Sequence, residues 1–262
     1  MKREMSVNGS FYPKDREEVH RYFEHFSKVY DETPYVTNNI AKAIIVPHAG
    51  YVYSGFTANI AYRILMKSNI KKFIVIGPSH RVAFNGVSIC TSTSYATPFG
   101  EIKSCKSLSE KLIENFSLNY YEDAHHEHST EVQFPFIKHY LPDAQIVELV
   151  YSSVEPAYIS KIIDFVLSQE DCGVIISTDL SHFYSLDKAK KLDNICLNAI
   201  NELDLKLLHS GCEACGMIGV EGMMMSAKKN GYKHELLDYR TSADFSNDDT
   251  RVVGYMSGYF YG

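Results

Sequence analysis

Residues 43–51 have the sequence AIIVPHAGY, in which a short apolar run ends and a histidine, His48, follows at once. The same event recurs at residues 73–80 (FIVIGPSH) and at residues 174–182 (VIISTDLSH). Each run is β-branched and nearly continuous, which is typical of a parallel strand buried on both faces. Ligands of open parallel sheets bind beyond the carboxyl ends of the strands. We therefore expect three histidines to converge on one crevice.

Helical and strand patterns alternate along the rest of the chain. Helices are predicted near residues 14–30, from Ser54 as N-cap to about residue 65, and near 105–116, 130–140, 156–169, 187–208 and 218–230. Strands are predicted near residues 42–46, 72–77, 86–91, 145–150, 173–178, 234–240 and 252–260, the last two antiparallel. This alternation predicts a single α/β domain over residues 1–262, a layered α/β/α arrangement with a mostly parallel central sheet.

Composition excludes several classes of protein. The formal charge is −6 over 262 residues, and no block of Lys and Arg indicates a nucleic-acid surface. The apolar runs are too short to span a bilayer, and the first residues lack the apolar stretch of a signal peptide. Six dispersed cysteines are typical of reduced thiols. We therefore expect a cytoplasmic protein that binds neither nucleic acid nor membrane.

Two pairs of residues follow the predicted strands. His48 and His80 occupy equivalent positions. A lone loop histidine more often makes only a hydrogen bond, but two in equivalent positions favour metal ligation by neutral imidazole. Asp179 and His182 lie three residues apart, where a carboxylate can hydrogen-bond an imidazole and raise its basicity. The alternative is that Thr178 or Asp179 caps a short helix.

Residues 121–129 form a polar segment that carries three histidines. His125 and His126 are interpreted as part of a solvated loop. His128 stands directly before an apolar run, so we expect it at the start of a helix near the crevice.

Residues 212–216 (CEACG) contain a single C-x-x-C motif. A zinc ribbon needs a second such pair, and the chain has none. Cys215 precedes Gly216 and an apolar helix pattern, and a helix N-terminus favours the thiolate, which is the ligand form. The alternative interpretation, a buried inert thiol, is preferred for Cys90, Cys105, Cys172 and Cys196.

Taken together, these segments resemble the Memo family. The segments that carry the resemblance are residues 9–12 (GSFY), 46–51 (VPHAGY), 77–80 (GPSH), 127–131 (EHSTE), 177–182 (STDLSH) and 214–216 (ACG). That family is similar in fold to the class III extradiol ring-cleavage dioxygenases, in which two histidines and a glutamate hold non-haem iron(II).

The resemblance implies a ligand set and proton-handling groups. His48 and His80 match the histidine ligands, and Cys215 falls at the position of the glutamate ligand. His182 and His128 match the proton-handling positions, with Asp179 beside them as a catalytic residue. A thiolate is softer than a carboxylate, so the expected cofactor is one transition-metal ion, iron(II) or copper, with zinc as the alternative. Glu221 is the only nearby carboxylate in the sequence that can replace Cys215.

Three functions remain open from the sequence. The first is a metal-dependent, dioxygenase-like oxidoreductase acting on an unknown small molecule. The second is a non-catalytic protein that binds a metal or a peptide on the same scaffold. The third is a metal-assisted hydrolase, since a bound metal can activate water. The resemblance also implies a pathway link with a radical-SAM protein and an AMMECR-type protein.

Overall fold

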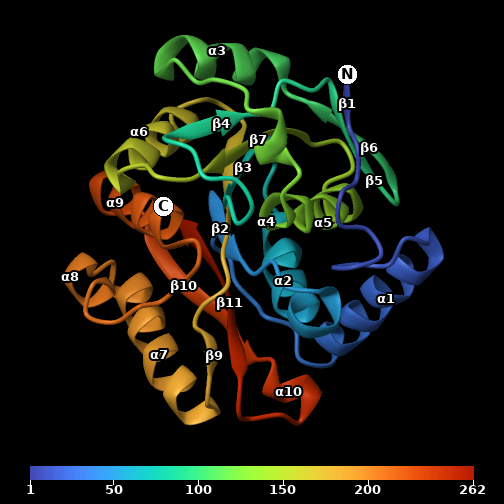
Figure 1. Cartoon of the computed structure of the whole chain (residues 1–262), viewed down its shortest axis with the longest axis vertical. Coiled ribbons are helices and arrows are strands. Elements are labelled where there is room, and N and C mark those ends of the chain that lie inside the picture. Colours follow the sequence, from blue (N-terminus) through green and yellow to red (C-terminus); the bar gives the residue numbers. More distant parts are fainter.

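A computed structural model describes residues 1–262, and its centre is an eleven-stranded sheet (Figure 1). The hydrogen-bonded order is β1-β5-β6-β7-β3-β8-β2-β11-β10, while β4 pairs with β7 and β9 pairs with β11. The strands are β1 (Lys2–Arg3), β2 (Ala43–Val46), β3 (Lys72–Pro78), β4 (Val87–Ile89), β5 (Ser94–Thr97), β6 (Gly100–Ser104), β7 (Gln145–Tyr151), β8 (Cys172–Ser177), β9 (His182–Tyr184), β10 (Lys233–Thr241) and β11 (Val252–Tyr261).

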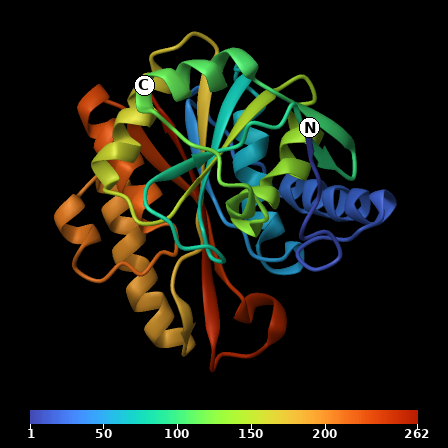
Figure 2. The ribbon, with the colours of Figure 1, turned by 45° about the horizontal axis from the view of Figure 1, so that its top comes forward.

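Helices cover both faces of this sheet, as the turned view in Figure 2 shows. One face packs against α2 and α5, and the other packs against α6, α7 and α9. The helices are α1 (Arg16–Glu32), α2 (Tyr51–Leu65), α3 (Lys106–Phe116), α4 (His128–Glu131), α5 (Gln133–Tyr140), α6 (Pro156–Leu167), α7 (Leu186–Glu202), α8 (Leu205–Leu208), α9 (Met217–Asn230) and α10 (Ala243–Ser246), with a short 3₁₀ helix, η1 (Glu122–His125). The predicted layered α/β/α class is confirmed.

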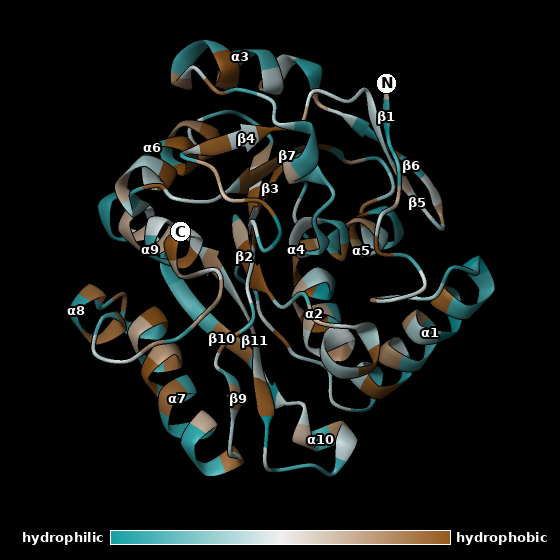
Figure 3. Cartoon of the chain, viewed as in Figure 1, coloured by the Kyte–Doolittle hydropathy of each residue, from teal (hydrophilic) through white to brown (hydrophobic).

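The central strands are apolar because both of their faces are covered. Figure 3 shows β3 and β7 coloured as hydrophobic, and every residue of β2 and β8 is buried. Strands β6, β7, β3, β8 and β2 are parallel in succession, while β11 joins β2 antiparallel and β10 joins β11 antiparallel. The predicted antiparallel pair at the end of the chain is therefore confirmed. No helix combines the length and apolar character needed to cross a membrane.

The position of β8 between β3 and β2 brings three carboxyl ends together. Ile76 of β3 pairs with Ile176 of β8, and Val46 of β2 pairs with Ser177 of β8. The segments that begin just beyond these strands therefore start at one edge of the sheet. Of the histidines that follow these strands, His48 and His80 lie in one group of possible ligands, whose third member is His128 and not His182.

Several local predictions differ from the structure. Helix α2 begins at Tyr51 with Gly50 as its N-cap, and the Ser54 hydroxyl instead donates to the Ala49 carbonyl inside the first turn. The helix predicted to run from 187 to 208 ends at Glu202, because Leu203 adopts a left-handed conformation with φ 51°. The β5–β6 hairpin was not predicted.

The cysteine prediction is wrong for one pair. Cys196 of α7 and Cys212 form a disulfide across a sequence separation of 16 residues. The packing of α8 against α7 folds the chain back so that these sulfurs meet, and spacing alone does not reveal such a contact. Cys90, Cys105 and Cys172 are free and buried, as expected.

The N-terminus is held by a buried ionic network. Arg3 donates to the Glu131 carboxylate, and its guanidinium lies 3.6 Å from the Glu148 carboxylate. His125, predicted to be solvated, is only 2 % exposed, and its Nδ1 lies 2.9 Å from Glu148. Its Nε2 lies 2.8 Å from the Ser88 hydroxyl. This prediction failed because a polar sequence around a histidine does not show a buried carboxylate on another strand. His126 is exposed, as expected.

Arg3 outweighs the effect of burial on Glu148. Burial alone would raise the pKa of this carboxyl, but Arg3 and His125 lower it to about 2. A carboxyl whose pKa is lower in the folded than in the unfolded chain stabilises the fold above its unfolded pKa, and that contribution disappears as pH falls through the folded pKa. The network therefore stabilises the fold near neutral pH and fails in acid.

We predict that Arg3→Met lowers the free energy of unfolding at pH 7 by roughly 3–5 kcal/mol, because it leaves two buried carboxylates without their cation. The difference from the parent should shrink as pH falls from about 4.5 toward 2, because the Glu148 carboxyl is protonated in the unfolded chain over this range while it is still ionised in the folded parent. Urea unfolding followed by circular dichroism measures both quantities. Lys2→Met, a change at an exposed neighbour, is the control. Equal loss in the two variants would contradict the network's role.

Candidate functional site

His48 lies directly after β2 and is almost fully buried, with 1 % of its surface exposed. Its backbone N–H donates to Asp179 Oδ1 at 2.8 Å, which ties the turn after β2 to the turn after β8. Its Nδ1 lies 3.0 Å from the Ser177 hydroxyl. The Ser177 proton is donated to the Ser129 carbonyl, so the Ser177 oxygen accepts from His48. Nδ1 therefore carries the ring proton, and Nε2 keeps its lone pair.

Burial also fixes the charge of this imidazole. Burial lowers the pKa of His48 well below its ordinary value, and the neighbouring His128 and His80 lower it further. The ring is neutral at physiological pH, which is the form of histidine that binds metals.

His80 and His128 share one carboxylate, that of Glu127. Glu127 is the N-cap of α4, and its side chain accepts the backbone N–H of His128 at 2.8 Å and that of His80 at 2.6 Å. The Nδ1 atoms of His80 and His128 lie 3.3 and 2.7 Å from Glu127 Oε1. Burial opposes ionisation, but the hydrogen bonds from His128 and His80 outweigh it and lower the pKa of Glu127 strongly. The ionised carboxylate only accepts, so both Nδ1 atoms donate, and in the neutral form of each ring the lone pair lies on Nε2.

A close backbone approach brings α4 to the end of β3. A Cβ atom at Gly77 would lie 2.5 Å from the Ser129 hydroxyl, a distance that real Cβ atoms do not reach. Only glycine at this position lets α4, which begins at His128, pack against β3. As predicted, His128 lies at a helix start.

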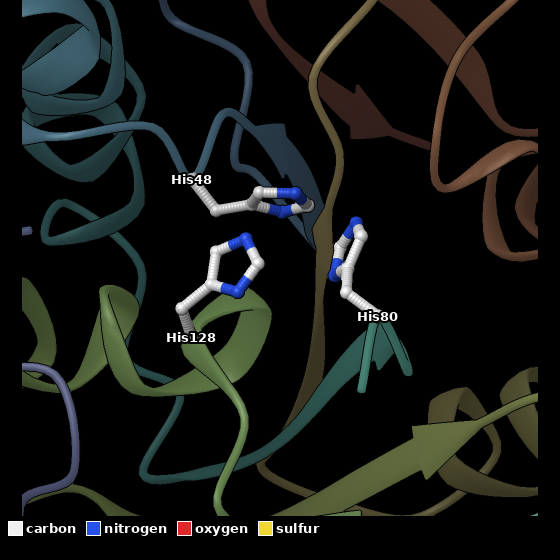
Figure 4. A group of neighbouring side chains, drawn as sticks. All are labelled: His48, His80 and His128. Carbon is white, nitrogen blue, oxygen red and sulfur yellow. The ribbon is translucent and has the colours of Figure 1, made fainter. Parts of the chain in front are cut away.

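The three imidazoles point toward one another across a common space (Figure 4). Each offers a ring nitrogen, and these nitrogens all lie within 4.8 Å of one another. Ring centroids are 5.2 Å apart for His48 and His80, 5.2 Å for His48 and His128, and 4.5 Å for His80 and His128. Three segments that are distant in sequence therefore present donor atoms to one point.

Cys215 lies beside one member of this group, His48. Its Sγ lies 3.3 Å from His48 Nε2 and 3.3 Å from the Asp179 backbone nitrogen. Burial raises the pKa of the Cys215 thiol to about 12, and the nearby Asp179 contributes to the same shift. The sulfur is therefore a neutral thiol that can donate to the free nitrogen of His48.

Asp179 is buried beside these groups without a lysine or arginine partner within 4.0 Å. Burial raises its pKa, and the hydrogen bond from His48 opposes the rise. No helix follows β8, so the proposed helix cap at Thr178 or Asp179 is not formed. The chain instead continues to β9, where His182 Nδ1 donates to the Leu180 carbonyl at 2.8 Å. Asp179 therefore binds the turn of His48 and forms no hydrogen bond with His182.

Sequence reasoning missed Glu127, Ser177 and the true surroundings of Glu221. Glu221 of α9 accepts from His209 Nε2 at 2.9 Å, and the carboxylates beside the histidines are Glu127 and Asp179 instead. The available signal for Glu127 was its position directly before the first residue of a helix, where a carboxylate caps the backbone.

A cleft of about 500 Å³ lies beside Phe11. Residues 9–14 and 50–53 line most of it, and Tyr22 contributes from α1. Phe11 links the cleft to the site, because its ring stacks on that of His128 with centroids 4.4 Å apart. Aromatic side chains therefore make up much of the lining, and one of them, Phe11, contacts an imidazole of the site.

A second group, Cys90, His125 and Glu148, also places donor atoms within 4.8 Å of one another. There the guanidinium of Arg3 already neutralises Glu148, and both ring nitrogens of His125 have protein partners. In the group of His48, His80 and His128, two Nε2 atoms have no protein partner and that of His48 contacts only the Cys215 thiol, so this group is the better candidate.

Comparison with known proteins identifies the family. The Memo-like protein family model matches residues 3–259. A MEMO1 family protein of Aquifex aeolicus is 33 % identical over 275 residues, covering 98 % of this chain and 98 % of the relative. One from Methanobrevibacter smithii is 34 % identical over 281 residues, covering 99 % and 100 %. One from Thermoplasma acidophilum is 31 % identical over 266 residues, covering 98 % of each. The match extends over nearly all of the chain, which therefore belongs to the Memo-like protein family.

Proposed function

We propose that the chain binds one transition-metal ion between His48, His80 and Cys215 or His128, and that it acts as a metal-dependent oxidoreductase on a small molecule. The observation that carries the proposal is the shared tautomer of the three imidazoles. In each of them Nδ1 has an acceptor in Ser177 or Glu127, so the neutral ring carries its lone pair on Nε2. Metal-binding histidines are commonly oriented in this way by a partner on the other nitrogen.

The charges around the histidines also fit a cation. Asp179 is a buried carboxyl with a raised pKa and no cationic side chain beside it. Glu127 has no lysine or arginine within 4.0 Å, and its only ion-pair partners are the two histidines. A bound cation would stabilise the ionised form of both carboxyls, since opposite charges nearby favour ionisation.

The third protein ligand distinguishes two forms of the site. With Cys215 the set is two imidazoles and a thiolate, which favours softer metals such as copper or zinc, whereas a set of three imidazoles also suits iron. Cys215 Sγ lies 3.3 Å from His48 Nε2, which is close to the separation of a nitrogen and a sulfur that bind one metal ion at about 2.1 and 2.3 Å, so a metal could replace the hydrogen bond. In the first form His128 is left free to move a proton.

Iron or copper bound here would supply one-electron chemistry and open coordination positions for a substrate. The chain itself would provide the rest. The cleft beside Phe11 gives a small molecule access to the histidines. His182, whose Nδ1 is committed to Leu180, has Nε2 available to accept a proton. Asp179 holds the turn that carries His48.

Cys215→Ser tests the ligand set. If the thiolate binds, we expect zinc affinity to fall by more than manganese affinity, because a hydroxyl is a hard and poorly ionised donor. Cys215→Glu should shift the preference toward iron(II). Isothermal titration with each metal measures the affinities, and Cys172→Ser, at the opposite end of β8, is the matched control. If Cys215→Ser binds every metal as the parent does, the three histidines hold the ion without the sulfur.

Asp179→Asn tests the charge beside the site. Asparagine can still accept the His48 backbone N–H, but the negative charge is gone. We expect metal affinity or turnover to fall about 10–100-fold, as is typical when a partner of a metal ligand is changed. Asp143→Asn, an exposed change between α5 and β7, should leave both quantities at the parent value. Unchanged affinity and turnover in Asp179→Asn would remove Asp179 from the site.

A further inference from the structure

A disulfide lies close in sequence to the free thiol of the candidate site. Cys196 of α7 is buried and bonded to Cys212. Cys215, only three residues beyond Cys212, is a free thiol beside His48. A disulfide and a thiol that are this close along the chain form the set of groups that thiol–disulfide exchange requires.

The segment that carries these sulfurs is fixed at both ends. Residues 209–216 connect α8 to α9. At one end Cys212 is bonded to Cys196, and its N–H donates to the Leu208 carbonyl at 3.2 Å. At the other end the Cys215 N–H donates to the Asp179 carbonyl at 3.2 Å. The disulfide is therefore part of what holds Cys215 at the histidines.

A short movement would bring Cys215 to Cys212. A disulfide needs Cα atoms roughly 4.4–6.8 Å apart, and the ends of a four-residue turn lie within about 7 Å. Residues 212–214 have no regular structure, so folding Glu213 and Ala214 into a turn breaks no helix or strand. Gly211 precedes them with φ 148°, a conformation that favours glycine, and it can absorb the change.

We propose that Cys215 can displace Cys196 from Cys212, so that the C-x-x-C motif closes and the sulfur leaves the metal site. Once the movement has taken Cys215 out of its buried position, the thiol loses its proton and the thiolate attacks Cys212 Sγ. The Cys212–Cys215 bond forms, the Cys196–Cys212 bond breaks, and Cys196 leaves as a thiolate that takes up the proton Cys215 released. One disulfide replaces another, so no oxidant or reductant is consumed.

The exchange would couple the thiol state of the chain to metal binding. A metal held by Cys215 excludes the exchanged form, and the exchanged form lacks the sulfur ligand. This consequence rests on the proposed function, but the exchange itself does not. Anything that binds only one of two interconverting forms shifts the balance toward that form.

Disulfide mapping tests the exchange directly. Chain freed of metal with a chelator is compared with zinc-loaded chain, each quenched in acid, denatured, treated with a maleimide and digested. We expect metal-free chain to yield a peptide containing the Cys212–Cys215 bond, together with alkylated Cys196. At a free zinc concentration of about 100 Kd, the ratio of exchanged to unexchanged chain should fall about 100-fold.

Each outcome separates the two proposals. Finding only the Cys196–Cys212 bond in metal-free chain overturns the exchange, whatever the chain does with zinc. If the Cys212–Cys215 bond forms but its amount is the same with and without zinc, the exchange is supported and Cys215 is not a ligand. The expected fall with zinc supports both.

Cys196→Ser provides a second measurement on folded protein. Without Cys196, treatment with oxidised glutathione should form the Cys212–Cys215 disulfide and weaken zinc binding at least about tenfold. Reduction with dithiothreitol, which is removed before the titration, should restore the zinc affinity. Cys172→Ser, which keeps all three cysteines, is the control, and circular dichroism confirms that both variants are folded. Unchanged zinc affinity together with a mapped Cys212–Cys215 bond excludes Cys215 as a ligand. Failure of that bond to form overturns the exchange.

Discussion

The pairing of β8 with β3 on one side and β2 on the other is the constraint on which the site depends. These strands are separated in the sequence by whole helices, yet parallel pairing aligns their carboxyl ends. His48 and His80 begin only two residues beyond β2 and β3, so the sheet positions them with little help from flexible loops. The hydrogen bond from the His48 backbone to Asp179 then fixes the turn after β2 against the one after β8. Residues that stand on strand ends and are tied to one another hold donor atoms more precisely than mobile loops do.

Much of this arrangement could be predicted from the sequence because buried parallel strands are nearly continuous apolar runs. The runs before His48, His80 and Asp179 predicted three strands whose structure agrees. Predictions that depended on short local patterns were less successful. Ser54 has the chemistry of an N-cap, but α2 begins earlier in the chain, at Tyr51, with Gly50 as its N-cap. The β5–β6 hairpin has short strands that β7 supports through pairing with β6, which is a tertiary contact.

The missed parts of the site share a physical reason. Glu127 matters because one carboxylate reaches the backbone and rings of two histidines from different elements. The burial of His125 depends on Glu148 of β7, and the bond between Cys196 and Cys212 depends on how α8 folds back on α7. Each is a contact between side chains brought together by the fold. Residue type and spacing do not reveal such partners. The sequence could therefore predict only where the histidines lie along the backbone.

Two neighbouring clusters of histidines and carboxylates differ in whether a cationic side chain balances the carboxylates. Both combine histidines with carboxylates along residues 125–131. In one, Arg3 contacts Glu131 and Glu148, so the negative charges are already balanced and the cluster fastens β1 to the domain. In the other, neutral His48 faces Asp179 and Glu127, and no lysine or arginine lies within 4.0 Å of either carboxyl. Burying a carboxyl without a cation is costly, and the fold accepts that cost beside three imidazoles whose Nδ1 atoms already have protein partners. Carboxyls without a lysine or arginine partner, beside three imidazoles that converge on one space, are the feature on which the proposed cation site rests.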